Sequence, residues 1–154
     1  MFSGNKSLIV AGTLSALGAF LHLGIIIGGP NWYRFFGAGE RMAQMVEKGM
    51  MYPIIATASI ALILFIWSAY AFSGAGIIKK LPFLKTGLIL IALILMVRAL
   101  FGFIVINYID HPYYNEIQAR PAFMLITSII CLVYGIFYII GTAKNWKVLN
   151  KKCT

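Results

Sequence analysis

The stretch GLILIALILMVRALFGFIVIN, residues 87–107, is apolar throughout except for Arg98 and the closing Asn107. A helix of ~20 residues is long enough to cross the ~30 Å hydrocarbon core of a bilayer. Three further runs of similar length and composition occupy residues 8–28, 52–72 and 122–143. The sequence therefore predicts an all-α fold, an integral membrane four-helix bundle.

The composition limits the domain organisation. Of the 154 residues, 61% are hydrophobic and only 11% are charged, so no separate soluble domain fits beside four spans. We expect residues 1–154 to form a single transmembrane domain. Because the first run is too long for the core of a signal peptide, we also expect it to remain as the first span.

The segments between the runs differ in charge, and this difference predicts the orientation. The four acidic residues all lie in the first and third of these segments, where four cations balance them. The second segment and the two tails hold only positive charges, on Lys6, Lys79, Lys80, Lys85, Lys144, Lys147, Lys151 and Lys152. Since Lys and Arg in short loops mark the cytoplasmic side, both termini are expected in the cytoplasm.

The formal net charge of +9 follows mainly from this lysine distribution. Such a charge favours contact with anionic membrane lipids. A basic groove with interleaved aromatic residues, typical of nucleic-acid binding, is missing, so we expect no nucleic-acid partner. Cys131 lies in the middle of a span and Cys153 in the tail, too far apart for a disulfide.

The first outer segment, residues 28–40, is rich in aromatic side chains. Four of them fall within five positions, at Trp32, Tyr33, Phe35 and Phe36. Aromatic residues anchor at headgroup depth, so an aromatic belt is one interpretation, and a lid or wall over a cavity between the helices is the other. Residues 40–51 follow with amphipathic spacing, which predicts either an interfacial helix or an outward extension of the second span.

The second outer segment, residues 107–121, brings polar and titratable groups into a short turn. Asp110, His111 and Glu116 are residue types that bind metals, but their spacing matches no known ligand pattern. We therefore predict a hydrogen-bonded outer cap there, with no metal site and no cofactor.

Two polar residues interrupt the apolar spans. Arg98 lies near the middle of the third span, where a charged side chain costs ~2.5–3.5 kcal/mol, so it should face the bundle interior, a polar cavity or a carboxylate. Glu47 or Glu40, if the amphipathic segment dips inward, and backbone carbonyls of the bundle are its expected partners. His22 is expected in the outer half of the first span. Arg98 could form a structural ion pair, and His22 could be a hydrogen-bonded histidine within the bundle. Alternatively, the two residues share a ligand pocket.

The ligand-binding interpretation combines these residues into one outward-facing pocket. Its predicted residues are Arg98, His22, Glu47, Glu40, Trp32, Arg34, Asp110, His111 and Glu116. A cation at the floor and aromatic walls would suit binding or movement of a lipid-like or amphipathic anionic small molecule.

Two other functions stay open at this point. The chain could be a structural or partner-binding subunit of an envelope complex, as a homo-oligomer or with another membrane protein. It could also be an outer-leaflet enzyme that uses His22 or His111 as general base and Arg98 to stabilise negative charge, or a haem protein with the two histidines as axial ligands. No nucleophile with an adjacent base is visible, so we name no catalytic residue.

Residues 28–40, GGPNWYRFFGAGE, resemble a stretch found in small four-helix bacterial inner-membrane proteins of unassigned function. This resemblance implies a multi-pass protein of the bacterial inner membrane. It implies no activity.

Overall fold

The computed structural model describes residues 5–108 and 121–149. Four helices are long and apolar enough to cross a membrane, namely α1 (Lys6–Gly28), α4 (Tyr52–Gly74), α5 (Leu84–Tyr108) and α7 (Pro121–Lys144). The short helices are α2 (Pro30–Phe35), α3 (Glu40–Glu47) and α8 (Trp146–Leu149). Neither described range contains a strand. The predicted all-α fold with four spans is confirmed, and the chain is a multi-pass membrane protein.

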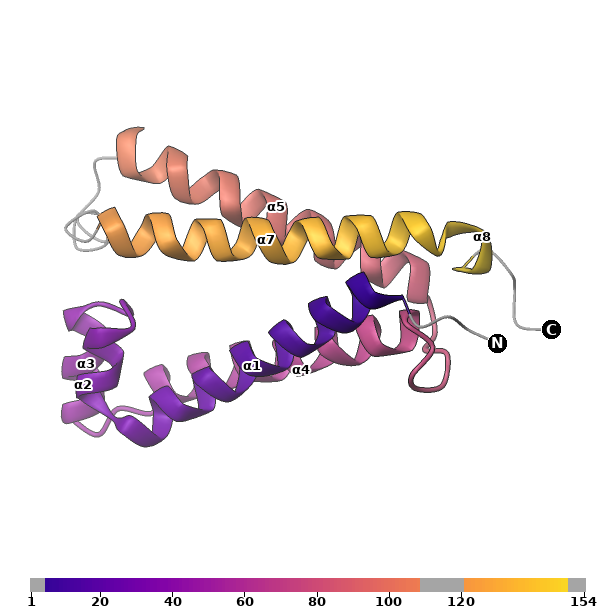
Figure 1. Ribbon diagram of the computed structural model, residues 1–154. Helices are drawn as coiled ribbons and strands as arrows, with labels where there is room; N and C mark the ends of the chain where they lie inside the picture. Colours follow the sequence, from indigo (N-terminus) through magenta and orange to yellow (C-terminus); the bar gives the residue numbers. More distant parts are fainter. Residues whose placement is uncertain (1–4, 109–120, 150–154) are drawn as a thin grey trace.

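The helices form two antiparallel pairs. In Figure 1, α1 lies along α4, and α5 lies along α7. The pairs approach each other at the end where α1 begins and α8 lies, and they diverge toward the end that carries α2 and α3. We call these the terminal end and the α2–α3 end.

Small residues allow the close approach of α1 and α4. Ala11, Ser15 and Ala19 are buried on α1, and a Cβ added at Gly12 would lie 2.9 Å from the ring of Phe72 on α4. The Phe72 ring and the Cβ of Ala71 therefore pack directly on the backbone of α1 at Gly12, and small residues at such contacts are a common basis of helix association in membranes.

The main core lies at the terminal end, where the two pairs meet. It joins Leu8 of α1, Ala71 of α4, Leu88 of α5 and Tyr138 of α7, all of them fully buried. At Gly141 of α7 an added Cβ would lie 2.5 Å from Cγ of Leu8, so the Leu8 side chain of α1 packs directly on the backbone of α7. The bundle is therefore closed by packing at this end.

The α2–α3 end is built around a glycine turn. The first span ends at Gly28, because Gly29 has φ 66° and Pro30 then begins α2. Tyr33 of α2 is buried against Ile25 of α1 and Ala43 of α3, and its hydroxyl donates to the carbonyl of Pro53, 3.2 Å away. The amphipathic segment predicted after residue 40 is thus a separate helix. It packs, through Tyr33 of α2, near the end of α1 and the start of α4.

Candidate functional site

Arg34 is the centre of an ion cluster on the α2–α3 end. Its Nε and Nη2 donate to the two carboxylate oxygens of Glu40, each 2.8 Å away, and Nη2 also donates to Glu47 at 2.8 Å. Glu40 and Glu47 are seven residues apart on α3, so two helical turns place them on the same face. The paired donors match the planar carboxylate of Glu40, which fixes the orientation as well as the distance.

The cluster links α2 to α3 across a turn of glycines. Gly37 and Gly39 have φ of 72° and 95°, values that other residues rarely adopt. The two carboxylates accept hydrogen bonds from Arg34 and raise the pKa of its guanidinium, so Arg34 stays charged at any accessible pH. All three side chains are partly exposed, so salt screens their attraction.

The aromatic residues of this end divide between the interior and the surface. Trp32 and Phe35 are exposed and Tyr33 is buried, and the ring of Trp32 lies 5.6 Å from that of Phe36. An added Cβ at Gly28 would overlap Trp32, so the indole lies directly on the last turn of α1. The exposed pair fits the predicted belt, whereas Tyr33 is a core residue of the α2–α3 end.

Arg98 is an exposed residue of α5. Ile91 and Leu95, which precede it on the same stripe of α5, are only 4% and 5% exposed. Ala99, the next residue, is still buried at 2% exposure, so Arg98 lies at the edge of the buried stripe of α5. Cys131 of α7 is half-buried and lies within electrostatic reach of Arg98.

The expected partners of Arg98 are engaged elsewhere. Glu40 and Glu47, the two acidic residues within the described ranges, both bond to Arg34. Among the described residues, none forms a hydrogen bond or ion pair with Arg98. The sequence could not reveal this competition, because it depends on the turn that brings α2 beside α3.

His22 lies on the face of α1 that is directed toward α7. Its Nδ1 is 2.7 Å from the carbonyl oxygen of Gly18, one turn earlier. Leu14, one further turn back, accepts a hydrogen bond from Tyr134 of α7 at 2.9 Å, which fixes the direction of this stripe. A carbonyl only accepts, so Nδ1 carries the proton and Nε2 of the neutral ring remains an acceptor.

The structure thus sorts the predicted residues into two groups. Arg34, Glu40 and Glu47 form one cluster, whereas Trp32 packs on the last turn of α1. His22 and Arg98 lie roughly 24 Å and 21 Å along their helices from the terminal end, on surfaces of different helix pairs. The predicted Asp110, His111 and Glu116 lie outside the described residues.

Sequence reasoning missed a polar seam in the terminal half of the spans. Ser68 of α4 donates to the carbonyl of Gly12 on α1 at 2.8 Å, and Tyr138 of α7 lies 3.0 Å from both Ser15 Oγ and the carbonyl of Trp67. The available signal was the spacing of Tyr134 and Tyr138, whose hydroxyls lie one helical turn apart in a mostly apolar run.

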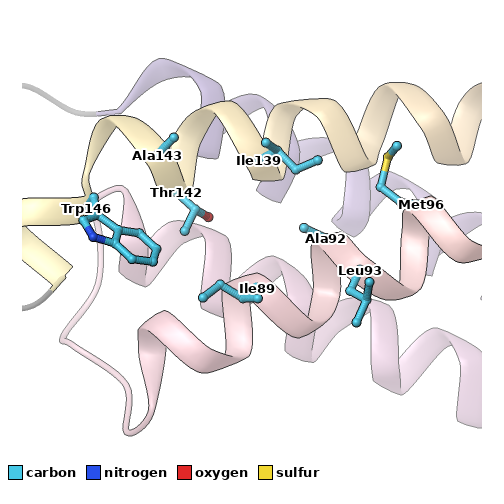
Figure 2. Close-up of a pocket in the computed structure, with 8 residues that line it drawn as sticks. All are labelled: Ile89, Ala92, Leu93, Met96, Ile139, Thr142, Ala143 and Trp146. Carbon is cyan, nitrogen blue, oxygen red and sulfur yellow. The ribbon is translucent and has the colours of Figure 1, made fainter.

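An apolar groove between α5 and α7 was also not predicted. It has a volume of about 350 Å³ and lies near the terminal end, away from the outer end where the sequence predicted a pocket. Figure 2 shows the side chains that line it, which include Ile89, Leu93, Met96, Ile139, Thr142 and Trp146. Its volume is at the lower limit of the ~300–1,000 Å³ typical of ligand sites.

The described residues form neither a pair of a histidine and a nucleophile nor a metal centre. His22 bonds only to a backbone carbonyl there, and no group of three or more His, Cys, Asp or Glu side chains within residues 5–108 and 121–149 could hold a metal ion. Comparisons with protein-family models, with curated proteins and with solved structures find no match to this chain.

Proposed function

We propose that this multi-pass membrane protein binds a lipid-like, amphipathic anion between its two helix pairs, with Arg98 as the counter-ion. The observation that carries the proposal is the exposed position of Arg98 on a membrane-spanning helix, with no acidic partner in the described part of the chain. An uncompensated charge near the bilayer centre is costly, and an anionic group that reaches it removes much of that cost.

The arrangement of the helices favours a ligand that dissolves in the bilayer. The pairs are joined at the terminal end and diverge toward the α2–α3 end. Arg98 is exposed on α5 among apolar side chains that are also exposed, such as Val97 and Phe101. An amphipath could approach this region from the lipid phase without displacing the Arg34 cluster. His22 adds an acceptor, Nε2, on the facing pair, which suits a ligand that carries a hydroxyl or protonated acid group.

We further propose that the protein lies in the bacterial inner membrane with both termini in the cytoplasm. The predicted cytoplasmic termini and the bacterial inner membrane are supported by the lysines of the second segment and the tails, and by the resemblance of residues 28–40 to small inner-membrane proteins. At this orientation Arg98 and His22 would be reached from the outer half of the bilayer.

A second function is favoured by the same observation. A carboxylate from a partner helix, in another membrane protein or a second copy, would compensate Arg98 equally well. The chain would then be a structural or partner-binding subunit, and its exposed apolar faces would be its interaction surface.

The test is native mass spectrometry of the protein extracted in mild detergent, with Arg98→Gln and Arg98→Lys compared with wild type. We expect a co-purified amphipathic anion on wild type, lost at least tenfold in Arg98→Gln and partly kept in Arg98→Lys. Lys6→Gln, which removes an exposed cation at the other end, is the matched control and should keep it.

Two results would overturn the ligand proposal. If wild type carries a stoichiometric protein partner that Arg98→Gln loses, Arg98 pairs with a subunit. If wild type carries neither ligand nor partner and Arg98→Gln lowers the unfolding temperature more than the control, Arg98 is a structural residue. Asp110→Asn and Glu116→Gln then identify which remaining acid it pairs with.

A further inference from the structure

We propose that the groove between α5 and α7 holds an acyl chain of one anionic phospholipid from the surrounding bilayer, with its headgroup at Trp146 and Lys85. This site lies near the terminal end and does not depend on Arg98 or on the proposed function.

The groove is shaped by small and long residues that alternate across two helices. Ala92 of α5 and Ala143 of α7 leave the space, and Ile89, Leu93 and Ile139 form its apolar walls (Figure 2). Several of these side chains are exposed on the outer surface of the helix pair, so the groove opens toward the lipid phase. An aliphatic chain is the occupant that such a surface meets in a bilayer.

The indole of Trp146 bounds the groove at the end of α7. The turn that leads to it is anchored, because Asn145 donates from Nδ2 to the carbonyl of Gly74 at 2.8 Å. The ammonium nitrogen of Lys85 lies 3.7 Å from the centre of the Trp146 ring. Tryptophan favours the membrane–water interface, so the Lys85–Trp146 pair marks the depth at which a headgroup would lie.

The charges at this end select the headgroup. Among the described residues, the second segment and the end of α7 contribute Lys79, Lys80, Lys85, Lys144 and Lys147, whereas the described acids, Glu40 and Glu47, lie on α3 at the opposite end. A cationic surface of this kind attracts anionic lipids in preference to zwitterionic ones.

Thr142 supplies an independent observation. The residue is 5% exposed and lines the groove, and its hydroxyl has no hydrogen-bond partner within the described chain. Figure 2 shows this oxygen on the side of α7 that faces α5. Thr142 of α7 precedes Trp146 of the Lys85–Trp146 pair, on the side toward the middle of the span, where the ester groups of a lipid lie below its headgroup. An ester carbonyl in the groove would give the hydroxyl an acceptor.

The test is native mass spectrometry after reconstitution with equal amounts of phosphatidylglycerol and phosphatidylcholine. In Arg98→Gln, which removes the cation of the proposed ligand site, we expect one retained phosphatidylglycerol per chain, in at least fivefold preference to phosphatidylcholine, and the groove variants below are made in this background. Ala143→Phe fills the groove and should abolish retention, whereas Ala58→Phe, the same change at an exposed alanine of α4, should not alter it. Lys85→Gln should weaken retention about fivefold, the effect of one cation near an anionic headgroup, and Lys79→Gln should weaken it less.

Three outcomes would each overturn the proposal. Equal retention of the two lipids would show that charge does not select the occupant. Retention by Ala143→Phe equal to that of Ala58→Phe would show that the groove is not the site. Equal losses in Lys85→Gln and Lys79→Gln would show that the headgroup does not lie at the Lys85–Trp146 pair.

Discussion

The hydroxyl of Tyr138 on α7 lies 3.0 Å from the hydroxyl of Ser15 on α1. Tyr138 also donates to the carbonyl of Trp67 on α4, 3.0 Å away, so its single proton is committed there and Ser15 must be the donor of the first bond. One phenol therefore links three spans. Both residues are fully buried, at the level where the helix pairs converge.

Tyr138→Phe removes both hydrogen bonds and keeps the ring. Because hydrogen bonds between helices in membranes are each worth ~0.6 kcal/mol on average and up to ~1.7, we expect a loss of about 1–2 kcal/mol in the free energy of unfolding. Reversible unfolding in mixed micelles measures it. Tyr52→Phe, at an exposed tyrosine, is the matched control. Equal stabilities of the two variants would show that the seam does not hold the pairs together.

Gly141→Ala tests the contact between α1 and α7. An added Cβ would lie 2.5 Å from Cγ and 3.2 Å from the backbone nitrogen of Leu8, so α1 itself would have to move. Such overpacking typically costs 1–3 kcal/mol, and we expect that loss in the unfolding free energy. At Gly18 the nearest atom would be 3.4 Å away, so Gly18→Ala should be neutral or slightly stabilising. A neutral Gly141→Ala would mean that the pairs are less closely joined.

The spans themselves were predictable because hydropathy and length act locally. The four apolar runs match α1, α4, α5 and α7 to within a few residues at each end. Proline and glycine signalled the end of α1, since Pro30 cannot continue the helix and Gly29 adopts a positive φ. These features depend on a few neighbouring residues, which the sequence displays directly.

The polar partners were not predictable, since they depend on which helices meet. Glu40 and Glu47 were expected near Arg98, but the turn at Gly37 and Gly39 places Arg34 within 2.8 Å of both carboxylates. The two exposed carboxylates of α3 therefore pair with Arg34, the cation that the glycine turn brings beside them. The groove beside Thr142 was hidden for the same reason, because its walls come from two helices far apart in the sequence.

Two buried serines allow a matched comparison. Ser68 donates to the carbonyl of Gly12, whereas Ser128 Oγ, fully buried on α7, has no partner among the described residues. Ser68→Ala should lower the unfolding free energy by about 1 kcal/mol. Ser128→Ala should leave it unchanged or raise it by up to ~1 kcal/mol, because it removes an unsatisfied hydroxyl. Chemical unfolding of both variants in one detergent gives the comparison. A destabilised Ser128→Ala would indicate that this hydroxyl has a partner in the folded protein.

Arg34→Gln should loosen the α2–α3 end without affecting the main core. The amides of Phe36, Gly37 and Ala38 donate to carbonyls of α2 where the turn to α3 begins, and their hydrogen exchange should accelerate when the guanidinium is lost. Since the side chains are exposed, high salt should produce part of the same acceleration in wild type. Arg41→Gln, on an exposed residue of α3, is the charge-matched control.

The pH dependence of this cluster follows from the raised pKa of Arg34. A cation whose pKa is higher in the folded state contributes fully below its unfolded value, and loses that contribution only as the pH rises through the folded one. Between pH 7 and 10, Arg34 stays charged. The ratio of exchange rates between Arg34→Gln and wild type, which cancels the intrinsic base catalysis of exchange, should therefore stay constant. A ratio that falls toward one over this range would show that a group other than Arg34 controls the turn.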